Sequence, residues 1–158
     1  MYNEFAAWSW KAAASNTTNN DGSTTSTVRA SQESGFSIVK TPSTSGAITF
    51  GHGLGTEPAM IINKGLTAAG WAWLVYHKDI GTGKYIKLND SAVAVTNAGS
   101  FSSVTSTTIT NNSANSSQDY INYCFANVDG YQRIGSFIGN GSATVSYTHL
   151  TLPTTPYV

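Results

Sequence analysis

Charged residues are scarce in this chain of 158 residues, and that scarcity excludes several classes of partner. They make up 10% of the sequence, compared with about a quarter in an average soluble domain. Eight basic residues balance eight acidic ones, so the formal net charge is zero. A chain without excess positive charge has no general attraction to a phosphate backbone or to an anionic membrane. We therefore expect no nucleic-acid partner and no membrane-surface partner.

Thiols and imidazoles are also few. The single cysteine, Cys124, excludes an internal disulfide and leaves too few thiols for a cysteine-based zinc or cluster site. Because it stands between two aromatic residues, we expect it to be a small and chemically inert core residue. The three histidines, His52, His77 and His149, have no paired spacing. The sequence therefore predicts neither a metal site nor a cofactor.

Long apolar runs and targeting signals are missing as well. No stretch approaches the roughly 20 apolar residues that a membrane helix needs. The first residues, Met1-Tyr2-Asn3-Glu4, lack the basic and apolar regions of a secretory signal. We therefore expect no membrane insertion and no export by a signal peptide.

Serine, threonine, asparagine and glycine supply the polarity instead, and between them lie short runs of β-branched and aromatic residues. Such runs, separated by glycine and proline turn signals at intervals of roughly 10 to 15 residues, predict antiparallel strands. No convincing helical pattern occurs. The sequence therefore predicts an all-β fold, an antiparallel β-sandwich of the jelly-roll or concanavalin-like type. The expected strands are 36–40, 47–50, 59–62, 71–77, 85–88, 107–110 and 120–126; the last is apolar on both faces and is expected to be central.

The chain begins with two segments that we expect to lie outside the sandwich. In residues 1–13, Trp8 and Trp10 alternate with small residues, which is typical of a half-buried strand and indicates the end of a preceding domain. Residues 14–32 contain little apolar material and no periodicity, which predicts a linker.

The sandwich itself is expected over residues 33–144. A weak echo of the segment that starts at Gly35 appears again at Gly130, and it indicates the start of a second repeat near residue 130. Residues 145–158 are similar to one reading frame of a transposase adapter used in sequencing libraries. We therefore expect them to be a non-native tail, which would make the chain a fragment at that end.

Several motifs occur together in a way that resembles a known family. The chain is similar to a recurring domain of uncharacterised function in tail-fibre-like and other structural proteins of bacteriophages. Residues 7–12 (AWSWKA) resemble the end of the domain that usually precedes it. The matching segments are 34–39 (SGFSIV), 51–55 (GHGLG), 58–62 (PAMII), 75–78 (VYHK), 123–126 (YCFA), 135–137 (GSF) and 139–142 (GNGS).

The resemblance implies a non-enzymatic part of a virion, assembled in the host cytoplasm and released as an extracellular particle. It implies contact with a host-surface receptor or glycan, other virion proteins as neighbours, and a homo-oligomer in the full-length fibre. It implies no catalytic residues. The chain departs from the family pattern at residues 63–65 (NKG), where Val-Lys and a charged turn are expected. That departure argues against a charge-based contact at the turn.

Two histidines and two tryptophans are candidate ligand-binding residues. His52 stands between glycines and would present its imidazole to a ligand, or it would be part of a glycine turn that requires positive φ. His77, at the end of the 71–77 strand, allows the same two interpretations. Trp71 and Trp73 share one face of that strand and form either a sugar-stacking platform or part of the core, while Tyr76 lies on the opposite face.

Catalytic motifs are incomplete. Residues 81–84 (GTGK) are similar to a phosphate loop. However, Lys78 stands where that motif requires a glycine, and Tyr85 stands where it requires a serine or threonine hydroxyl. No Gly-x-Ser-x-Gly elbow occurs. A lectin-like carbohydrate-binding module remains as an alternative function, and so does a fragment of a polysaccharide-degrading fibre that uses two carboxylates. The carboxylates available for the latter are Glu57, Asp79, Asp90, Asp119 and Asp129.

Overall fold

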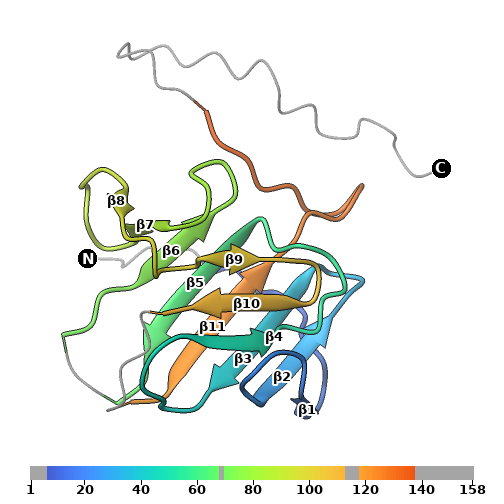
Figure 1. Ribbon diagram of the computed structural model, residues 1–158. Coiled ribbons are helices and arrows are strands. Elements are labelled where there is room, and N and C mark those ends of the chain that lie inside the picture. Colours follow the sequence, from blue (N-terminus) through green and yellow to red (C-terminus); the bar gives the residue numbers. More distant parts are fainter. Residues whose placement is uncertain (1–6, 68–69, 113–117, 138–158) are drawn as a thin grey trace, which may run out of the picture.

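The described part of the chain is built from two antiparallel sheets and contains no helix. The computed structural model describes residues 7–67, 70–112 and 118–137, and Figure 1 shows the smaller sheet lying across one face of the larger. The predicted all-β antiparallel sandwich is therefore confirmed. In the described ranges, the structure offers no helix with the length and apolarity of a membrane span.

The larger sheet has eight strands and the smaller has three. In spatial order, the larger sheet contains β1 (Thr17–Asn19), β2 (Ser26–Ser31), β3 (Phe36–Thr41), β11 (Tyr120–Phe125), β5 (Met60–Gly65), β6 (Leu74–His77), β7 (Lys84–Lys87) and β8 (Val95–Thr96). The smaller sheet contains β4 (Ile48–Gly51), β10 (Thr108–Asn111) and β9 (Ser103–Val104). The strand β11 lies between β3 and β5, which confirms the central position predicted for residues 120–126.

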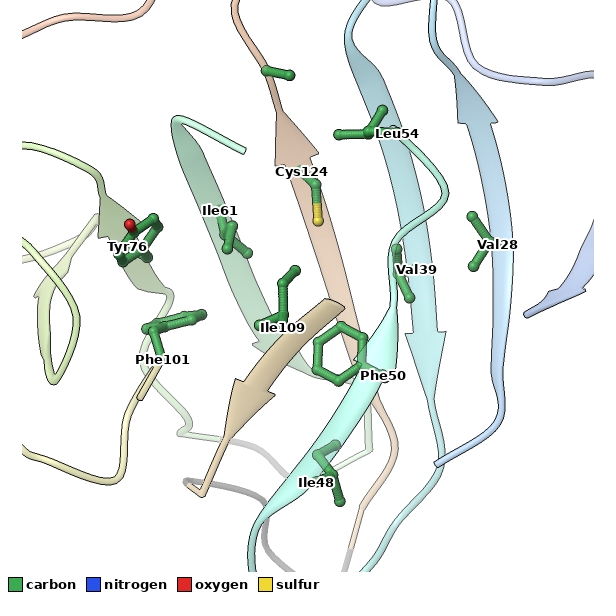
Figure 2. Close-up of a cluster of buried hydrophobic side chains, with 11 residues drawn as sticks. Val28, Val39, Ile48, Phe50, Leu54, Ile61, Tyr76, Phe101, Ile109 and Cys124 are labelled. Carbon is green, nitrogen blue, oxygen red and sulfur yellow. The ribbon is translucent and has the colours of Figure 1, made fainter. Parts of the chain in front are cut away.

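Strand alternation places one set of apolar side chains between the two sheets (Figure 2). Ile61 on β5 lies opposite both Tyr76 on β6 and Cys124 on β11. From the smaller sheet, Phe50 and Ile109 face this layer, and both are buried. Burying a large apolar side chain contributes about 1.5–3 kcal/mol, so this layer supplies the main driving force for the packing of the two sheets.

A pair of buried amides interrupts that apolar layer. Asn63 on β5 lies opposite Asn122 on β11, and its Nδ2 donates to the Asn122 Oδ1 at 2.7 Å. The Asn122 Nδ2 in turn donates to the Val39 carbonyl oxygen on β3 at 3.4 Å. Because an unpaired buried amide is costly, these bonds favour the register that brings the two asparagines together.

The segment 14–32, expected to be a linker, is largely part of the sandwich, so that expectation is wrong. It contains β1 and β2, which pair with each other, and β2 pairs with β3. Although the segment is rich in polar residues, Val28 is buried opposite Val39, and the Ser26 hydroxyl donates to the Gly51 carbonyl oxygen at 2.9 Å. Two strands therefore join the sheet with only a few apolar side chains.

The segment before β1 also packs on this sandwich, although we expected it to end a preceding domain with a strand. Its described residues, 7–13, form no strand. The Trp10 ring instead lies against Phe125 and Phe36, with ring centroids 5.4 and 6.1 Å apart. These contacts cover one end of the outer face of the larger sheet.

The outer face of the larger sheet, which points away from the smaller sheet, is itself apolar at its centre. Strand register aligns five side chains in one row across five neighbouring strands. They are Ile86, Val75, Ile62, Tyr123 and Ile38, and we call them the outer row. Its members are half-buried apart from Val75, which is buried. The apolar composition of both faces explains why β11 reads as a continuous apolar run.

Two sequence-based expectations fall largely outside the described residues. The non-native tail expected at 145–158 lies entirely outside them. The second repeat expected from residue 130 is described only to residue 137, where the chain shows one isolated bridge, between Val128 and Gln132.

Candidate functional site

The four candidate residues occupy three separate places in the fold. Trp71 and Trp73 precede the first residue of β6, whereas His77 is its last residue, so the tryptophans and this histidine lie at opposite ends of the strand. His52 follows β4 in the smaller sheet. The structure thus brings the tryptophans together and leaves the histidines apart.

The two indoles are partly exposed, so the interpretation of these residues as core is wrong. Each is 37% exposed. Tyr76, in contrast, is buried with its ring 5.7 Å from that of Phe101, which confirms that it lies on the opposite face. The strand expected over 71–77 begins only at Leu74, but the Leu88 N–H still donates to the Trp73 carbonyl oxygen at 2.9 Å. That bond fixes the backbone of Trp73 to the end of β7.

Lys64 joins the two tryptophans. Its Nζ donates a hydrogen bond to the Trp71 carbonyl oxygen and lies 5.6 Å from the centroid of the Trp73 ring. An ammonium at that distance from an indole is attracted by the ring quadrupole. Residues 63–65, expected to form a turn, instead end β5, so Lys64 projects from a paired strand. The expectation of a turn at this point is therefore wrong.

Two exposed leucines extend this surface. Leu66 follows β5 and is 47% exposed, and Leu88 follows β7 and is 61% exposed. We call Lys64, Leu66, Trp71, Trp73 and Leu88 the tryptophan corner. Exposed apolar groups gathered at one place often mark an interaction site. Sequence reasoning found the two tryptophans but missed the other three residues, because their proximity depends on the pairing of β5, β6 and β7.

Lys64 carries a charge that the described part of the chain does not neutralise. The nearby lysines are paired: the Lys40 Nζ lies 2.9 Å from Asp119, and the Lys87 Nζ lies 3.8 Å from Asp90. The hydrogen bond from Lys40 holds the pKa of Asp119 below its usual value. Lys64 has no carboxylate within 4 Å among the described residues. The tryptophan corner is therefore locally positive although the chain has no net charge.

His52 is buried and is part of a glycine turn, so the interpretation of it as an exposed ligand-binding residue is wrong. Its side chain is inaccessible to solvent. The Leu54 N–H donates to Nδ1 at 3.3 Å, and Nε2 lies 3.2 Å from the Thr105 carbonyl oxygen. A neutral ring with its proton on Nε2 satisfies both bonds, and burial lowers the pKa of His52. Gly53 and Gly55 have φ of 74° and 71°, as the turn interpretation requires.

His77 is engaged with its own turn. Its Nδ1 accepts a hydrogen bond from the Asp79 N–H at 3.2 Å and lies 3.8 Å from the Asp79 Oδ2. The Ser136 hydroxyl donates to that same carboxylate at 2.6 Å, and this bond is the main reason why the pKa of Asp79 is lowered. A serine nucleophile would need its hydroxyl on the imidazole. The contacts here instead describe a turn that is tied to the C-terminal segment.

The only cysteine of the chain lies in the core. Cys124 is fully buried, and burial raises the pKa of its thiol to about 12. A thiol in this environment is not ionised near neutral pH, so it is a poor nucleophile and a poor metal ligand. In the described ranges, no three histidine, cysteine or acidic side chains gather into a group that would hold a metal ion.

The fold and the tryptophan corner together define a class: an antiparallel β-sandwich with an exposed aromatic surface beside a lysine that has no carboxylate partner among the described residues. Within that class, residues 2–151 match the family described as Domain of unknown function (DUF7483), and the chain belongs to this family. The match runs across the boundaries expected at residues 13, 32 and 144. No curated protein matches the chain, and no solved structure matches it.

Proposed function

We propose that this domain is a non-enzymatic module of a bacteriophage virion fibre, and that it contacts host-surface glycans through the tryptophan corner. The observation that carries the glycan contact is the exposure of Trp71 and Trp73 beside Lys64. The assignment to a virion rests on the sequence motifs that resemble phage structural proteins. In this proposal, the chain is assembled in the host cytoplasm and works on the extracellular particle.

The chemistry of the tryptophan corner suits sugars. An indole offers a broad apolar face and an N–H donor at its edge, so it can stack on the C–H face of a sugar ring and still bond a hydroxyl. Tryptophan also dominates the energetics of many binding surfaces. The Trp73 backbone is held by its bond to Leu88, which reduces the entropy lost when a ligand binds.

Three of the carboxylates considered for a polysaccharide-degrading fibre have structural partners, which supports the non-enzymatic proposal. Asp79 accepts a hydrogen bond from Ser136. The other two, Asp90 and Asp119, are paired with Lys87 and Lys40, respectively. Their positions are accounted for by these contacts without a catalytic role.

We also propose that the domain forms a homo-oligomer with further copies of itself. The outer row supports this part of the proposal. Its apolar side chains are aligned over five strands, and removing apolar surface from water lowers the free energy of the system. Oligomers of this kind bury the same patch on each copy when they are two-fold symmetric.

The glycan contact is tested by binding of the full chain to a panel of immobilised bacterial surface polysaccharides. Trp71→Ala and Trp73→Ala are each expected to weaken binding about tenfold or more, which corresponds to the loss of one stacking contact of about 1.4 kcal/mol or more. The matched control is Tyr131→Ala, which removes an aromatic ring that is 62% exposed in the turn after β11.

Thermal unfolding of each variant shows whether the fold is retained. Binding that is lost while the melting temperature is unchanged supports the proposal. If both tryptophan variants bind as the wild type does, the assignment of the corner is wrong. Release of reducing ends from any of these polysaccharides by the full chain would contradict the proposal that the domain is not an enzyme.

A further inference from the structure

We infer that the tryptophan corner selects saccharides that carry negative charge, and that Lys64 is the residue that recognises the charge. This inference rests on the proposed glycan contact and adds a ligand class to it. The departure at residues 63–65 pointed away from a charge-based contact, but that expectation assumed a turn. Lys64 is instead held on a strand that is paired on both sides.

The position of Lys64 follows from strand register. On β5 it lies opposite Ile121 of β11, and Ile121 lies opposite Lys40 of β3, so all three side chains point to the outer face. The next position along the β5–β6 pairing, after Asn63 opposite Leu74, would bring Trp73 beside Lys64, and the distance of 5.6 Å to the ring agrees. The charge is therefore fixed beside the exposed indole.

The hydrogen-bonding capacity of the ammonium is only partly used. A lysine ammonium has three donors and no acceptor. The Trp71 carbonyl oxygen takes one donor, and the Trp73 ring gives an electrostatic attraction. No carboxylate of the described residues lies within ion-pair distance. A ligand carboxylate or sulfate can accept a remaining donor in a charge-assisted bond, which is about twice as strong as a neutral one.

Neighbouring charges do not cancel this one. Lys40 lies in the same row of the sheet as Lys64, and its partner Asp119 immediately precedes β11. The Asp119 carboxylate already accepts from Lys40 and from the Ser43 N–H. The pair Lys87–Asp90 brackets Leu88 in the sequence. Each pair is neutral as a whole, so a ligand at the tryptophan corner meets one net positive charge.

The experiment compares three immobilised polysaccharides of similar length: polygalacturonate with carboxylates, dextran sulfate with sulfates, and neutral dextran. The probes are presented to the full chain at low and moderate salt. The wild type is expected to bind one or both charged probes about tenfold more tightly than dextran, and salt is expected to reduce that preference. The charged probe that binds more tightly identifies the anionic group.

Substitutions at Lys64 separate the charge from the contact. Lys64→Gln keeps a donor for the Trp71 carbonyl oxygen but removes the charge, so it is expected to abolish the preference for the charged probes over dextran. Lys64→Arg keeps a positive charge at this position and is expected to keep the preference for the charged probes. The control is Lys84→Gln at the opposite end of β7 from Lys87, where the lysine is exposed.

Different outcomes test the role of Lys64 and the glycan contact separately. If Lys64→Gln keeps the preference for the charged probe, the role of Lys64 is wrong while the glycan contact still stands. If the wild type binds all three probes equally and Trp71→Ala weakens all three, the corner binds saccharides without recognising charge. If the wild type binds no saccharide in this panel or in the bacterial panel, both the inference and the glycan contact are wrong.

Discussion

His52 shows how burial turns a chemically versatile side chain into a structural one. Its ring accepts a hydrogen bond on Nδ1 and lies within bonding distance of a carbonyl oxygen on Nε2, so the neutral form fits the site on both sides. A second proton would need Nδ1 to give up the bond from Leu54. The side chain therefore stabilises the link between the end of β4 and the segment after β9 only while it is neutral.

This arrangement predicts a loss of stability at mildly acidic pH. Burial holds the pKa of His52 in the folded chain below its ordinary value of 6.5. The unfolded chain therefore binds the proton first as the pH falls. The free energy of unfolding is expected to fall below a pH of about 6.5, by at most about 1.4 kcal/mol per pH unit, until the pH passes the folded pKa.

Urea unfolding between pH 4.5 and 8 measures this effect. His52→Gln is expected to be less stable at neutral pH and to show a flatter dependence on pH in this range. The matched control, His77→Gln at the end of β6, leaves His52 in place and is expected to keep the loss of stability that the burial of His52 causes. A wild-type stability that does not change between pH 7 and pH 5 would contradict the prediction.

At the scale of the elements, the strands that the sequence revealed are those with local apolar or aromatic runs. The predicted segments 36–40 and 120–126 correspond to β3 and β11. In contrast, β1, β8 and β9 are only two or three residues long. The strand β2 is longer, but its inward positions hold Ser26, Val28 and Ala30, so its composition resembles a linker. Its structure depends on pairing with β3, the next strand along the chain, and on contacts with more distant residues such as the Gly51 carbonyl oxygen.

The same limit applies to the candidate site. Trp71 and Trp73 are two positions apart in an expected strand, so their shared face is a local signal, and they were predicted as candidates on that basis. Lys64 was read as part of a turn, because the end of β5 depends on its bonds to β11 and β6. The burial of His52 was equally hidden, since the carbonyl that accepts its bond belongs to Thr105, 53 residues later in the sequence.

The membership of β2 in the sheet gives a test at the level of this element. Backbone amides of β2 that pair with β3 are expected to be protected from hydrogen exchange to nearly the same degree as those of β11. In a linker, they would exchange as fast as in a peptide. Hydrogen–deuterium exchange followed by mass spectrometry measures both strands in one experiment.

A variant sharpens that experiment. Val28→Asp places a carboxylate in the core opposite Val39 and is expected to destabilise the fold by about 3 kcal/mol or more. The matched substitution Thr27→Asp changes an exposed neighbour on the same strand and is expected to have little effect. Fast exchange throughout β2 in the wild type, or equal stability of the two variants, would show that β2 is not part of the folded sheet.

At the scale of the whole molecule, the larger sheet has two apolar faces and the smaller sheet covers only one of them. The Trp10 ring covers part of the other face, over Phe36 and Phe125. The outer row lies between this end and the row that contains Lys64. The proposed homo-oligomer would bury it against another copy of the domain.

This proposal predicts a mass larger than the monomer value of 16.7 kDa in size-exclusion chromatography with light scattering. Tyr123→Asp places a charge in the middle of the outer row and is expected to shift the equilibrium toward monomer. Tyr131→Asp, at an exposed turn outside the row, is expected to leave the mass unchanged. A wild type that stays monomeric at high micromolar concentration would contradict the proposal for this domain.

The labelling rate of Cys124 measures how often the centre of the molecule opens. It is the only thiol, it is fully shielded, and it lies on the strand that joins β3 to β5. A disulfide reagent can reach it only when the sandwich opens, so the rate of labelling reports how often the middle of the larger sheet comes apart. The native thiol therefore reports transient opening of the fold, and no engineered cysteine is needed.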